Sequence, residues 1–164
     1  MALLLLVVFF PGLLGQAGSH FGWLQERRAL ELQANLELAR SVAATFDAYI
    51  RDIIHQELAI GLALTSPQPV SVEQANRLLA AGAAAYPSIY HYSWVNPQGR
   101  VIASSTIEAV GLEVGDLPFF REIVAGREWV VSDLFPSRLP RAEPVFCVAR
   151  GIRDEEGTLQ GVVV

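Results

Sequence analysis

Apolar and polar positions change their spacing along the 164-residue chain, and each spacing predicts a different element. Residues 2–14 are apolar throughout and carry no charge. From 23 to 65 there is no proline, and apolar residues recur at alternating four- and three-residue steps, which predicts one helix of about 40 residues. Glu57 is the only break in that apolar row. After Pro87 the period shortens to two, which predicts β-strands.

The long predicted helix has a broad apolar face. Its main row comprises Leu32, Leu36, Ala39, Ala43, Phe46, Ile50, Ile53, Ile60 and Leu64, and a second row comprises Leu38, Val42, Tyr49, Ile54 and Leu58. Two rows make a wider face than the narrow stripe of a pure coiled coil. Packing on a sheet and pairing with a second copy of the helix both fit this pattern, and successive stretches can serve each purpose.

Two further helices are predicted from their end signals. Ser71 and Gln74 form a capping box that starts a helix at 72, and this helix ends near 85 because Pro87 follows. Pro118 suits the first turn of a short helix that ends at Gly126. Strands are expected at 89–95, 100–105, 129–135, 143–152 and 159–164. The sum is an α+β domain, with a long helix packed on a five-stranded antiparallel sheet and the helices on one face.

The amino-acid composition indicates that the chain also has a membrane segment. Hydrophobic residues make up 52% of the chain and the mean hydropathy is +0.34, which is high for a soluble domain. Residues 2–14 would span only about 20 Å as a helix, but an apolar helix to Leu24 is long enough to cross a bilayer. We expect a membrane anchor at 1–24, with a cleaved signal peptide as the alternative.

The distribution of charge bears on how the chain is oriented in the membrane and on which partners it binds. Arg27 and Arg28 follow the apolar segment and no basic residue precedes it, so the positive-inside rule alone would place the rest of the chain in the cytoplasm. The net charge is −5, and all 12 basic residues are arginine, with no basic run. Nucleic acid is therefore not an expected partner, because phosphate binding needs clustered positive charge.

Four motifs together resemble a known family. They are "YSWVNPQGRVIASS", "VGDLPFFREIVAG", "VVSDLF" and "EPVFCVARGIRDEEGTLQGVVV", and in this order and spacing they resemble the Cache (PAS-like) extracytoplasmic sensor domains of bacterial membrane receptors. The resemblance implies a domain outside the bacterial cytoplasmic membrane that binds a small molecule. It also implies that the signal passes through the membrane to a histidine kinase, diguanylate cyclase or chemotaxis region, none of which this sequence contains.

One motif departs from the family pattern. Amino-acid-binding members carry an arginine and a tryptophan, two residues apart, at the start of the short helix. Leu117 and Phe119 occupy those positions here. The resemblance therefore does not extend to this mode of recognising free amino acids.

The candidate ligand-binding residues are Tyr92, Trp94, Phe119, Arg121, Asp133 and Arg138. Arginine suits a carboxylate ligand, although Arg121 also fits a surface pair with a glutamate and Arg138 a solvated loop. Asp133 fits a turn as well as a ligand contact. The aromatic residues Tyr92 and Trp94 suit stacking on a flat or cationic ligand, and equally suit packing on a helix.

Enzymatic chemistry is not expected in this chain. It contains no nucleophile elbow, no phosphate-binding glycine loop and no paired catalytic carboxylates. The three histidines lack metal-ligand spacing, so no metal and no cofactor are expected. Cys147, the only cysteine, lies in an apolar strand that suits core packing.

We therefore expect three parts: an anchor or signal peptide at 1–24, a long helix at 25–66, and a sensor domain at 67–164. Because the last strand is still apolar at Val164, the domain is expected to continue beyond it. The expected function is ligand sensing outside the membrane, with a small molecule such as a carboxylate as ligand and a homodimer formed through the long helix. The alternatives are a secreted or tethered binding protein without output, and a purely structural dimerisation module.

Overall fold

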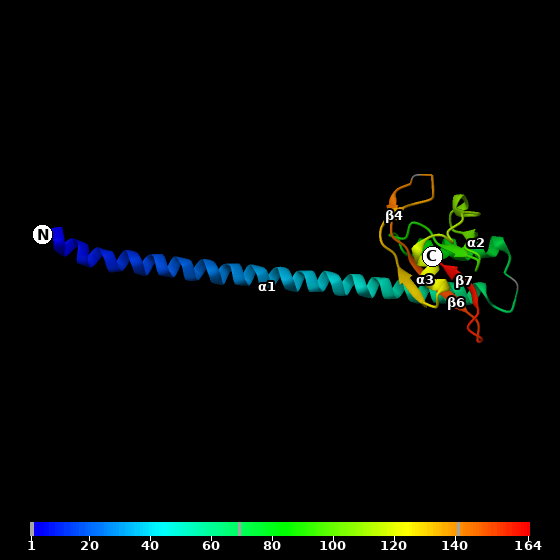
Figure 1. Ribbon diagram of the computed structural model, residues 1–164, viewed down its shortest axis with the longest axis horizontal. Helices are drawn as coiled ribbons and strands as arrows, with labels where there is room; N and C mark the ends of the chain where they lie inside the picture. The colour runs from blue at the N-terminus through cyan, green and yellow to red at the C-terminus, as the bar shows by residue number, and fades with distance from the viewer. Residues whose placement is uncertain (1, 69, 141) are drawn as a thin grey trace. The chain divides into compact units, whose positions relative to one another are not determined.

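A computed structural model describes residues 2–68, 70–140 and 142–164, and for 2–26 and 29 it describes only the backbone. Helix α1 covers Ala2–Leu64, so the predicted long helix ends within a residue of its expected C-terminus. The chain divides into two units, residues 1–48 and 49–164, which are described separately. The second unit contains the last part of α1 and all other elements, and Figure 1 labels α1, α2, α3, β4, β6 and β7.

Five antiparallel strands form the main sheet in the order β2-β1-β7-β6-β3, which confirms the predicted fold class. The strands are β1 (Ser93–Val95), β2 (Val101–Ser104), β3 (Trp129–Val131), β6 (Val148–Arg153) and β7 (Leu159–Val163). A 3₁₀ turn, η1 (Ile107–Ala109), follows β2. Strand β1 begins later than expected because the backbone N–H of Tyr92 donates to Ser105 Oγ instead of to a neighbouring strand.

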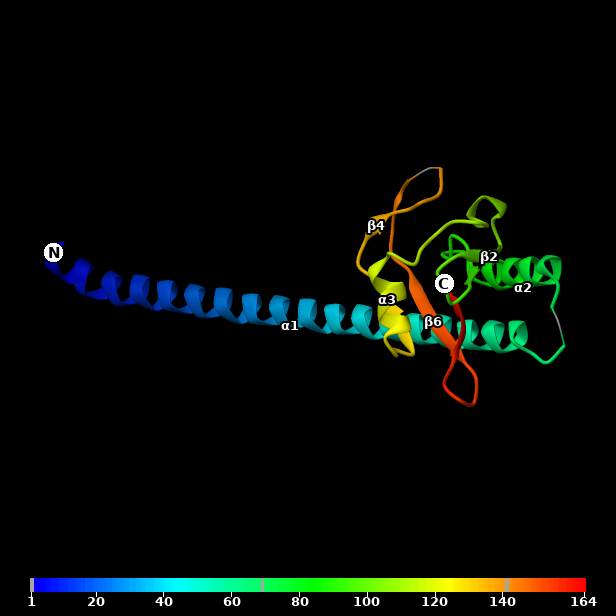
Figure 2. The same cartoon turned by 45° about the vertical axis from the view of Figure 1, so that its right-hand side comes forward.

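A second, two-stranded sheet was not expected. It consists of β4 (Phe135–Pro136) and β5 (Pro144–Val145), where the sequence predicted the end of one long strand and the start of another. The predicted strand 143–152 divides before β6, because the backbone N–H of Cys147 donates to Ser132 Oγ at 2.9 Å rather than to a backbone carbonyl. Figure 2 shows the resulting β4–β5 hairpin beside α3.

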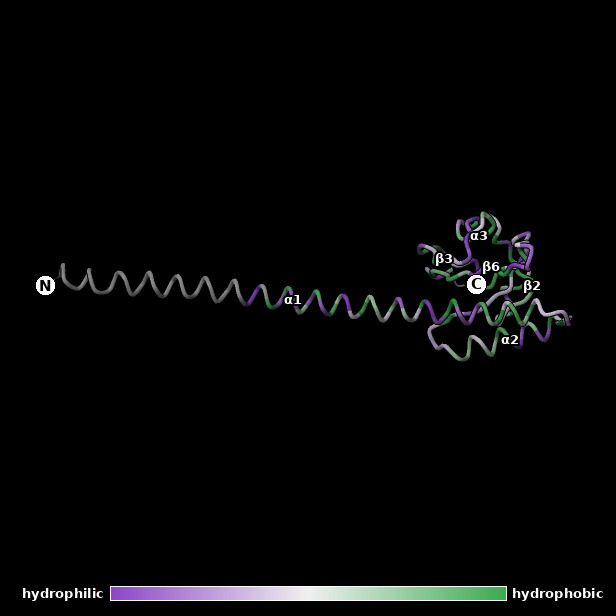
Figure 3. Tube along the Cα trace, turned by 90° about the horizontal axis from the view of Figure 1, so that it is seen from below, coloured by the Kyte–Doolittle hydropathy of each residue, from purple (hydrophilic) through white to green (hydrophobic). Residues whose placement is uncertain are grey.

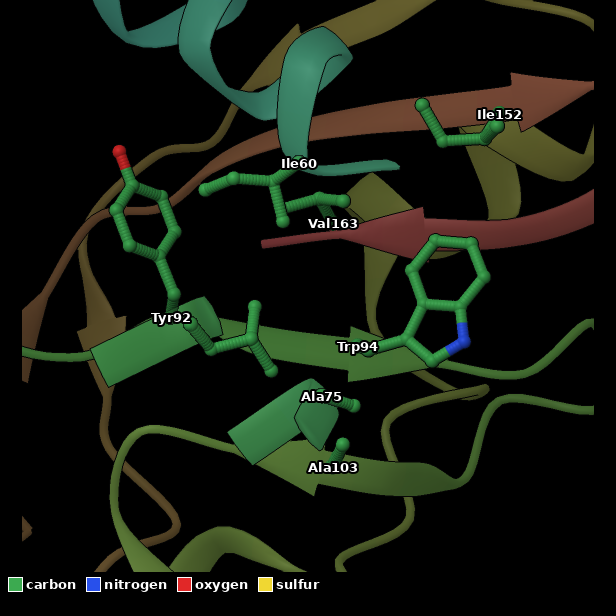
Figure 4. Packing of buried hydrophobic residues seen from close by; sticks show 8 residues of the cluster. Ile60, Ala75, Tyr92, Trp94, Ala103, Ile152 and Val163 are labelled. Atoms are coloured by element: carbon green, nitrogen blue, oxygen red, sulfur yellow. The ribbon is translucent and has the colours of Figure 1, made fainter. Parts of the chain in front are cut away.

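Helices α1 and α2 cover one face of the main sheet. Helix α2 spans Val72–Ala85 and has the predicted capping box between Ser71 and Gln74. One core cluster joins these helices to the sheet, and Figure 4 shows most of its members: Ile60, Ala75, Leu79, Tyr92, Trp94, Ala103, Ile152 and Val163. A second cluster extends the same interface with Ile50, Ile53, Ile54 and Val148. The apolar row of α1 is therefore a sheet-packing face from residue 50 onward.

Helix α3 (Pro118–Val124) packs on the opposite face, so the expectation that all helices share one face is wrong. Figure 3 shows α3 on one side of the strands and α2 on the other. The physical reason is the alternation of side chains along β6. Val148 and Ile152 face α1, whereas Ala149 packs with the α3 cluster. Gly151 also faces α3, where a Cβ atom would lie 2.8 Å from Ile123 Cγ2.

Polar contacts attach α1 to α2 and to the segment that leads into β1. Gln56 accepts a hydrogen bond from the Tyr92 hydroxyl at 3.2 Å and donates to the carbonyl of Gly82 at 3.2 Å. The Tyr86 hydroxyl donates to Asp52, which raises the pKa of Tyr86 above its usual value. These contacts of Asp52 and Gln56 hold α1 against the rest of the domain, in addition to its apolar packing.

Candidate functional site

The α3 face of the sheet is built around a short helix with clear end signals. Pro118 occupies the first turn of α3, and Gly126, at φ +112°, follows its C-cap Ala125. Phe119, Phe120 and Ile123 are buried against the sheet. Their partners are Val95, Val101, Val130, Ala149 and Val162. Helix α3 thus packs over one part of this face through its buried side chains.

The β4–β5 hairpin lies against α3 at an aromatic contact. The rings of Phe119 and Phe135 are stacked, with centroids 6.2 Å apart and an interplanar angle of 30°. Phe135 is only half-buried, whereas Phe119 is fully buried. The sequence pointed to Phe119 but missed Phe135, although Phe135 stands only two residues after the candidate Asp133.

A charged contact also connects the hairpin to the segment before α3. Arg138 Nη2 lies 2.5 Å from Asp116 Oδ2, and Arg138 Nη1 donates to the carbonyl of Glu113. This hydrogen bond to Arg138 holds the pKa of Asp116 below its usual value. Arg138 is therefore bonded rather than a freely solvated loop residue. Asp116 was not expected from the sequence, since 22 residues separate it from its partner.

Three of the six candidate residues lie on or beside this face, and Asp133 lies in the segment between β3 and β4. Phe119 is in its core, and Arg138 bridges the hairpin and the α3 segment. Arg121 is exposed on α3, and its charge contributes to the lowered pKa of Asp116. Asp133 is exposed, and its carbonyl accepts a hydrogen bond from Ser132 Oγ at 2.8 Å. The structure thus brings two arginines close to one carboxylate beside α3.

Tyr92 and Trp94 lie on the other face. Both are buried in the cluster that joins α1 and α2 to the sheet, as Figure 4 shows. The indole of Trp94 lies directly over Gly161 of β7, and the Tyr92 hydroxyl bonds to Gln56 of α1. The structure therefore does not bring Tyr92 and Trp94 together with Phe119 and the arginines.

Nucleophilic chemistry is not favoured at Cys147. Burial raises the pKa of its thiol to about 11, so the group is a neutral thiol near pH 7. Among the described residues, no group of three or more His, Cys, Asp or Glu side chains is arranged to hold a metal ion.

The expected membrane anchor at 1–24 lies outside the residues whose side chains the structure describes. Within the described part of the chain, no helix combines the length and the apolar character that a membrane crossing requires.

Comparison with known proteins supports the fold. No protein-family model and no curated protein matches the chain. Among solved structures, an extracellular ligand binding receptor from Desulfohalobium retbaense is similar at a TM-score of 0.62 with 14% identity, covering 74% of this chain and 22% of that one. The sensor domain of the V. cholerae histidine kinase DctB is similar at a TM-score of 0.60 with 22% identity, covering 81% of this chain and 53% of that one.

The sensor domain of E. coli DcuS is similar at a TM-score of 0.50 with 16% identity, and here the match covers 70% of this chain and 88% of that one. The chain spans about half or less of the other two structures. At these identities the likeness concerns the fold. The fold expected from the motifs is confirmed, because the chain shares it with these extracellular receptor and sensor domains.

Proposed function

We propose that this chain is the ligand-sensing, extracytoplasmic part of a transmembrane signal-transduction receptor in the bacterial cytoplasmic membrane. The observation that carries the proposal is that different elements pack on the two faces of the sheet. One face packs on α1 and α2, whereas the other packs on α3, on the segment before α3 and on Phe135 of the β4–β5 hairpin. The hairpin contacts α3 at Phe119, and through Arg138 it contacts Asp116 in the segment before α3. The same fold occurs in extracellular sensor domains.

The proposed site lies beside α3, beneath the β4–β5 hairpin. Phe119, Arg121, Asp133 and Arg138 are its proposed ligand-binding residues, and a small carboxylate is its proposed ligand. A carboxylate would compete with Asp116 for the planar guanidinium of Arg138, which is suited to two parallel hydrogen bonds. Tyr92 and Trp94 support the site from the other face by holding the sheet against α1.

The proposed signal passes from this site to α1. A ligand that draws α3 and the hairpin together shifts the sheet, and α1 packs on the far face of the same strands. Such a shift is transmitted only if the ligand binds one arrangement more tightly than the other. If scrambling residues 30–60 left the ligand response of a complete receptor unchanged, this relay would be excluded.

Thermal unfolding of the full chain in detergent tests ligand binding. Against panels of small carboxylates, amines and purines, we expect at least one carboxylate to raise the unfolding midpoint, since binding to the folded state stabilises it. In Arg138→Gln the affinity for that compound should fall roughly 10- to 100-fold, because hydrogen bonds to a charged group contribute about 1.5–3 kcal/mol.

Arg127→Gln is the matched control. Arg127 is an exposed arginine that lies 3.3 Å from Glu122, away from the Arg138 contact, so its replacement should leave the affinity unchanged. No response to any compound in the panels would favour the structural dimerisation module. Equal effects of the two substitutions would remove Arg138 from the site.

We also propose a homodimer that forms through the first part of α1. Leu32, Leu36, Leu38 and Val42 are all at least half exposed there, although each belongs to one of the two apolar rows. In sedimentation experiments, Leu36→Glu should weaken dimerisation about 100-fold or more, since burying an unpaired charge costs several kcal/mol. Leu62→Glu, at an exposed leucine outside both rows, should leave the dimer intact. A wild-type chain that stays monomeric at every concentration would exclude this dimer.

A secreted or tethered binding protein without output remains the alternative, and it uses the same site. The coding sequence downstream of Val164 distinguishes the two. A second apolar span of about 20 residues followed by an output region supports the receptor. A further secreted domain without such a span supports the binding protein.

A further inference from the structure

Glu57 is a fully buried carboxyl group in the apolar face of α1. It is 0% exposed and lies between Ile53 and Ile60, which pack on the sheet. Neither of its side-chain oxygens has a hydrogen-bond partner among the described residues. A charged carboxylate without partners is costly inside a protein, so burial raises the pKa of Glu57 well above its usual value. The site therefore favours the protonated, neutral form.

Among the described residues, three ionisable groups outside α1 interact electrostatically with Glu57. Arg150 of β6 carries the positive charge that partly offsets the effect of burial on the pKa of Glu57. Tyr92, just before β1, and Cys147, just before β6, are close enough that the charge of Glu57 would raise their pKa values. Both groups are neutral near pH 7, so Arg150 is the cation that an ionised Glu57 would attract.

Arg150 is placed between two carboxyl groups. Strand alternation puts it on the α1 face of β6, between Val148 and Ile152. Its Nη2 lies 3.9 Å from Oε2 of Glu128, an exposed residue in the turn between α3 and β3. Its Nε is buried and has no hydrogen-bond partner among the described residues. One end of the guanidinium thus points to the turn after α3, while the other has an unused donor in the interior.

We propose that Glu57 is a proton-binding site and that Arg150 changes its carboxylate partner with the charge of Glu57. When Glu57 is neutral, Arg150 pairs with Glu128, as in this structure. When Glu57 loses its proton, Arg150 turns inward to pair with it.

This exchange links the two faces of the sheet. Glu128 belongs to the turn that follows α3, and its carbonyl accepts the backbone N–H of Gly151 at 2.9 Å. Glu57 belongs to α1. Proton loss therefore draws α1 toward β6 and releases the side chain of Glu128 beside α3. The proton is a second input, beyond the small molecule proposed above, and it requires no other ligand.

The sign of the pH effect follows from the raised pKa. Below the usual carboxyl pKa, Glu57 is protonated in both the folded and the unfolded chain, so it has no effect on the pH dependence of stability. Between the usual and the raised pKa, only the unfolded chain releases the proton, so folding becomes less favourable as pH rises. Above the raised pKa, Glu57 is ionised in both the folded and the unfolded chain, so stability no longer changes with pH on its account. The pH range between the two pKa values is the titration window of Glu57.

Urea unfolding of the full chain in detergent, without added ligand, tests this pH dependence of stability over about pH 4 to 9. Relative to Glu57→Gln, which keeps the shape but cannot ionise, the wild-type unfolding constant should rise about tenfold per pH unit within the titration window. A wild-type to Glu57→Gln ratio that stays constant across the range would overturn the proposal.

Two further substitutions test the partner exchange. Arg150→Gln should move the upper end of the window to higher pH, because it removes the cation that stabilises ionised Glu57. Glu128→Gln should move it to lower pH, because Arg150 then has no competing carboxylate. Glu122→Gln, which removes a carboxylate 3.3 Å from Arg127, is the control and should leave the window in place. Shifts of both test variants in the same direction would contradict the exchange.

Infrared spectroscopy gives a second readout if Glu57→Gln does not fold. A protonated carboxyl band in the wild-type chain should disappear at a higher pH in Arg150→Gln and at a lower pH in Glu128→Gln. Loss of that band at the same pH in all three proteins would contradict the proposal. Because no small molecule is present, these outcomes are independent of the ligand screen.

Discussion

Replacing Gly161 with valine is expected to destabilise the domain by about 3 kcal/mol, near the upper end of the usual cost of overpacking. Strand β7 brings the Gly161 backbone directly under the indole of Trp94. A Cβ atom at residue 161 would lie 2.3 Å from Trp94 Cζ2 and 2.4 Å from Cη2, closer than packed carbon atoms approach. Trp94 is rigid and buried among the side chains drawn in Figure 4, so it has no free space to move into.

Urea unfolding of the valine variant measures this effect. Gln160→Val is the matched control, because Gln160 is the preceding residue of β7 and its side chain is exposed. The control should change the unfolding free energy by only a small amount. If both variants were equally stable, the close packing of Trp94 on β7 would be wrong.

The second large effect is expected for Ile123→Ala, at about 2 to 5 kcal/mol. Ile123 is 0% exposed and packs α3 on the sheet beside Gly151, so truncation leaves a cavity under the helix. The same change loosens the helix that lies beside the proposed ligand site. Val124→Ala, one residue along α3 at a position 52% exposed, should cost far less. Equal midpoints for the two variants in denaturant unfolding would show that α3 is not anchored by Ile123.

Elements with local end signals were predicted closely. The capping box of Ser71 and Gln74 and the position of Pro87 gave α2 with the bounds that the structure has. Pro118 gave the start of α3 for the same reason. Pro97 and Gly99 are typical of a tight turn between the strands predicted at 89–95 and 100–105, and Gly99 adopts the positive φ of +88° that glycine tolerates. Local sequence determines such features because the interacting groups are only a few residues apart.

The packing of the long helix on the sheet was predicted, but the individual contacts between distant residues were not. Alternation showed that Tyr92 and Trp94 share one face of a strand, but not that α1 and α2 cover this face while α3 covers the other. The contact between Arg138 and Asp116 depends on how the hairpin folds back toward α3. Neither partner carries a local signal of the other, so the candidate site was assembled only in part from the sequence.

Glu57 shows that an exception to a pattern can be informative. It was the only break in the main apolar row of the long helix, and the structure places it in the middle of the buried face. The sequence could not identify its neighbour, because Arg150 comes from a strand more than 90 residues further along the chain.

The most direct test of the proposed sensing site is amide hydrogen exchange of the wild-type chain, with and without a compound that raises its thermal midpoint. If the small molecule binds on the α3 face, exchange should slow in Pro118–Val124 and in Phe135–Val145, with smaller changes in α2. Protection confined to Val72–Ala85, with both α3-face segments unchanged, would place the ligand on the other face and contradict the proposed site.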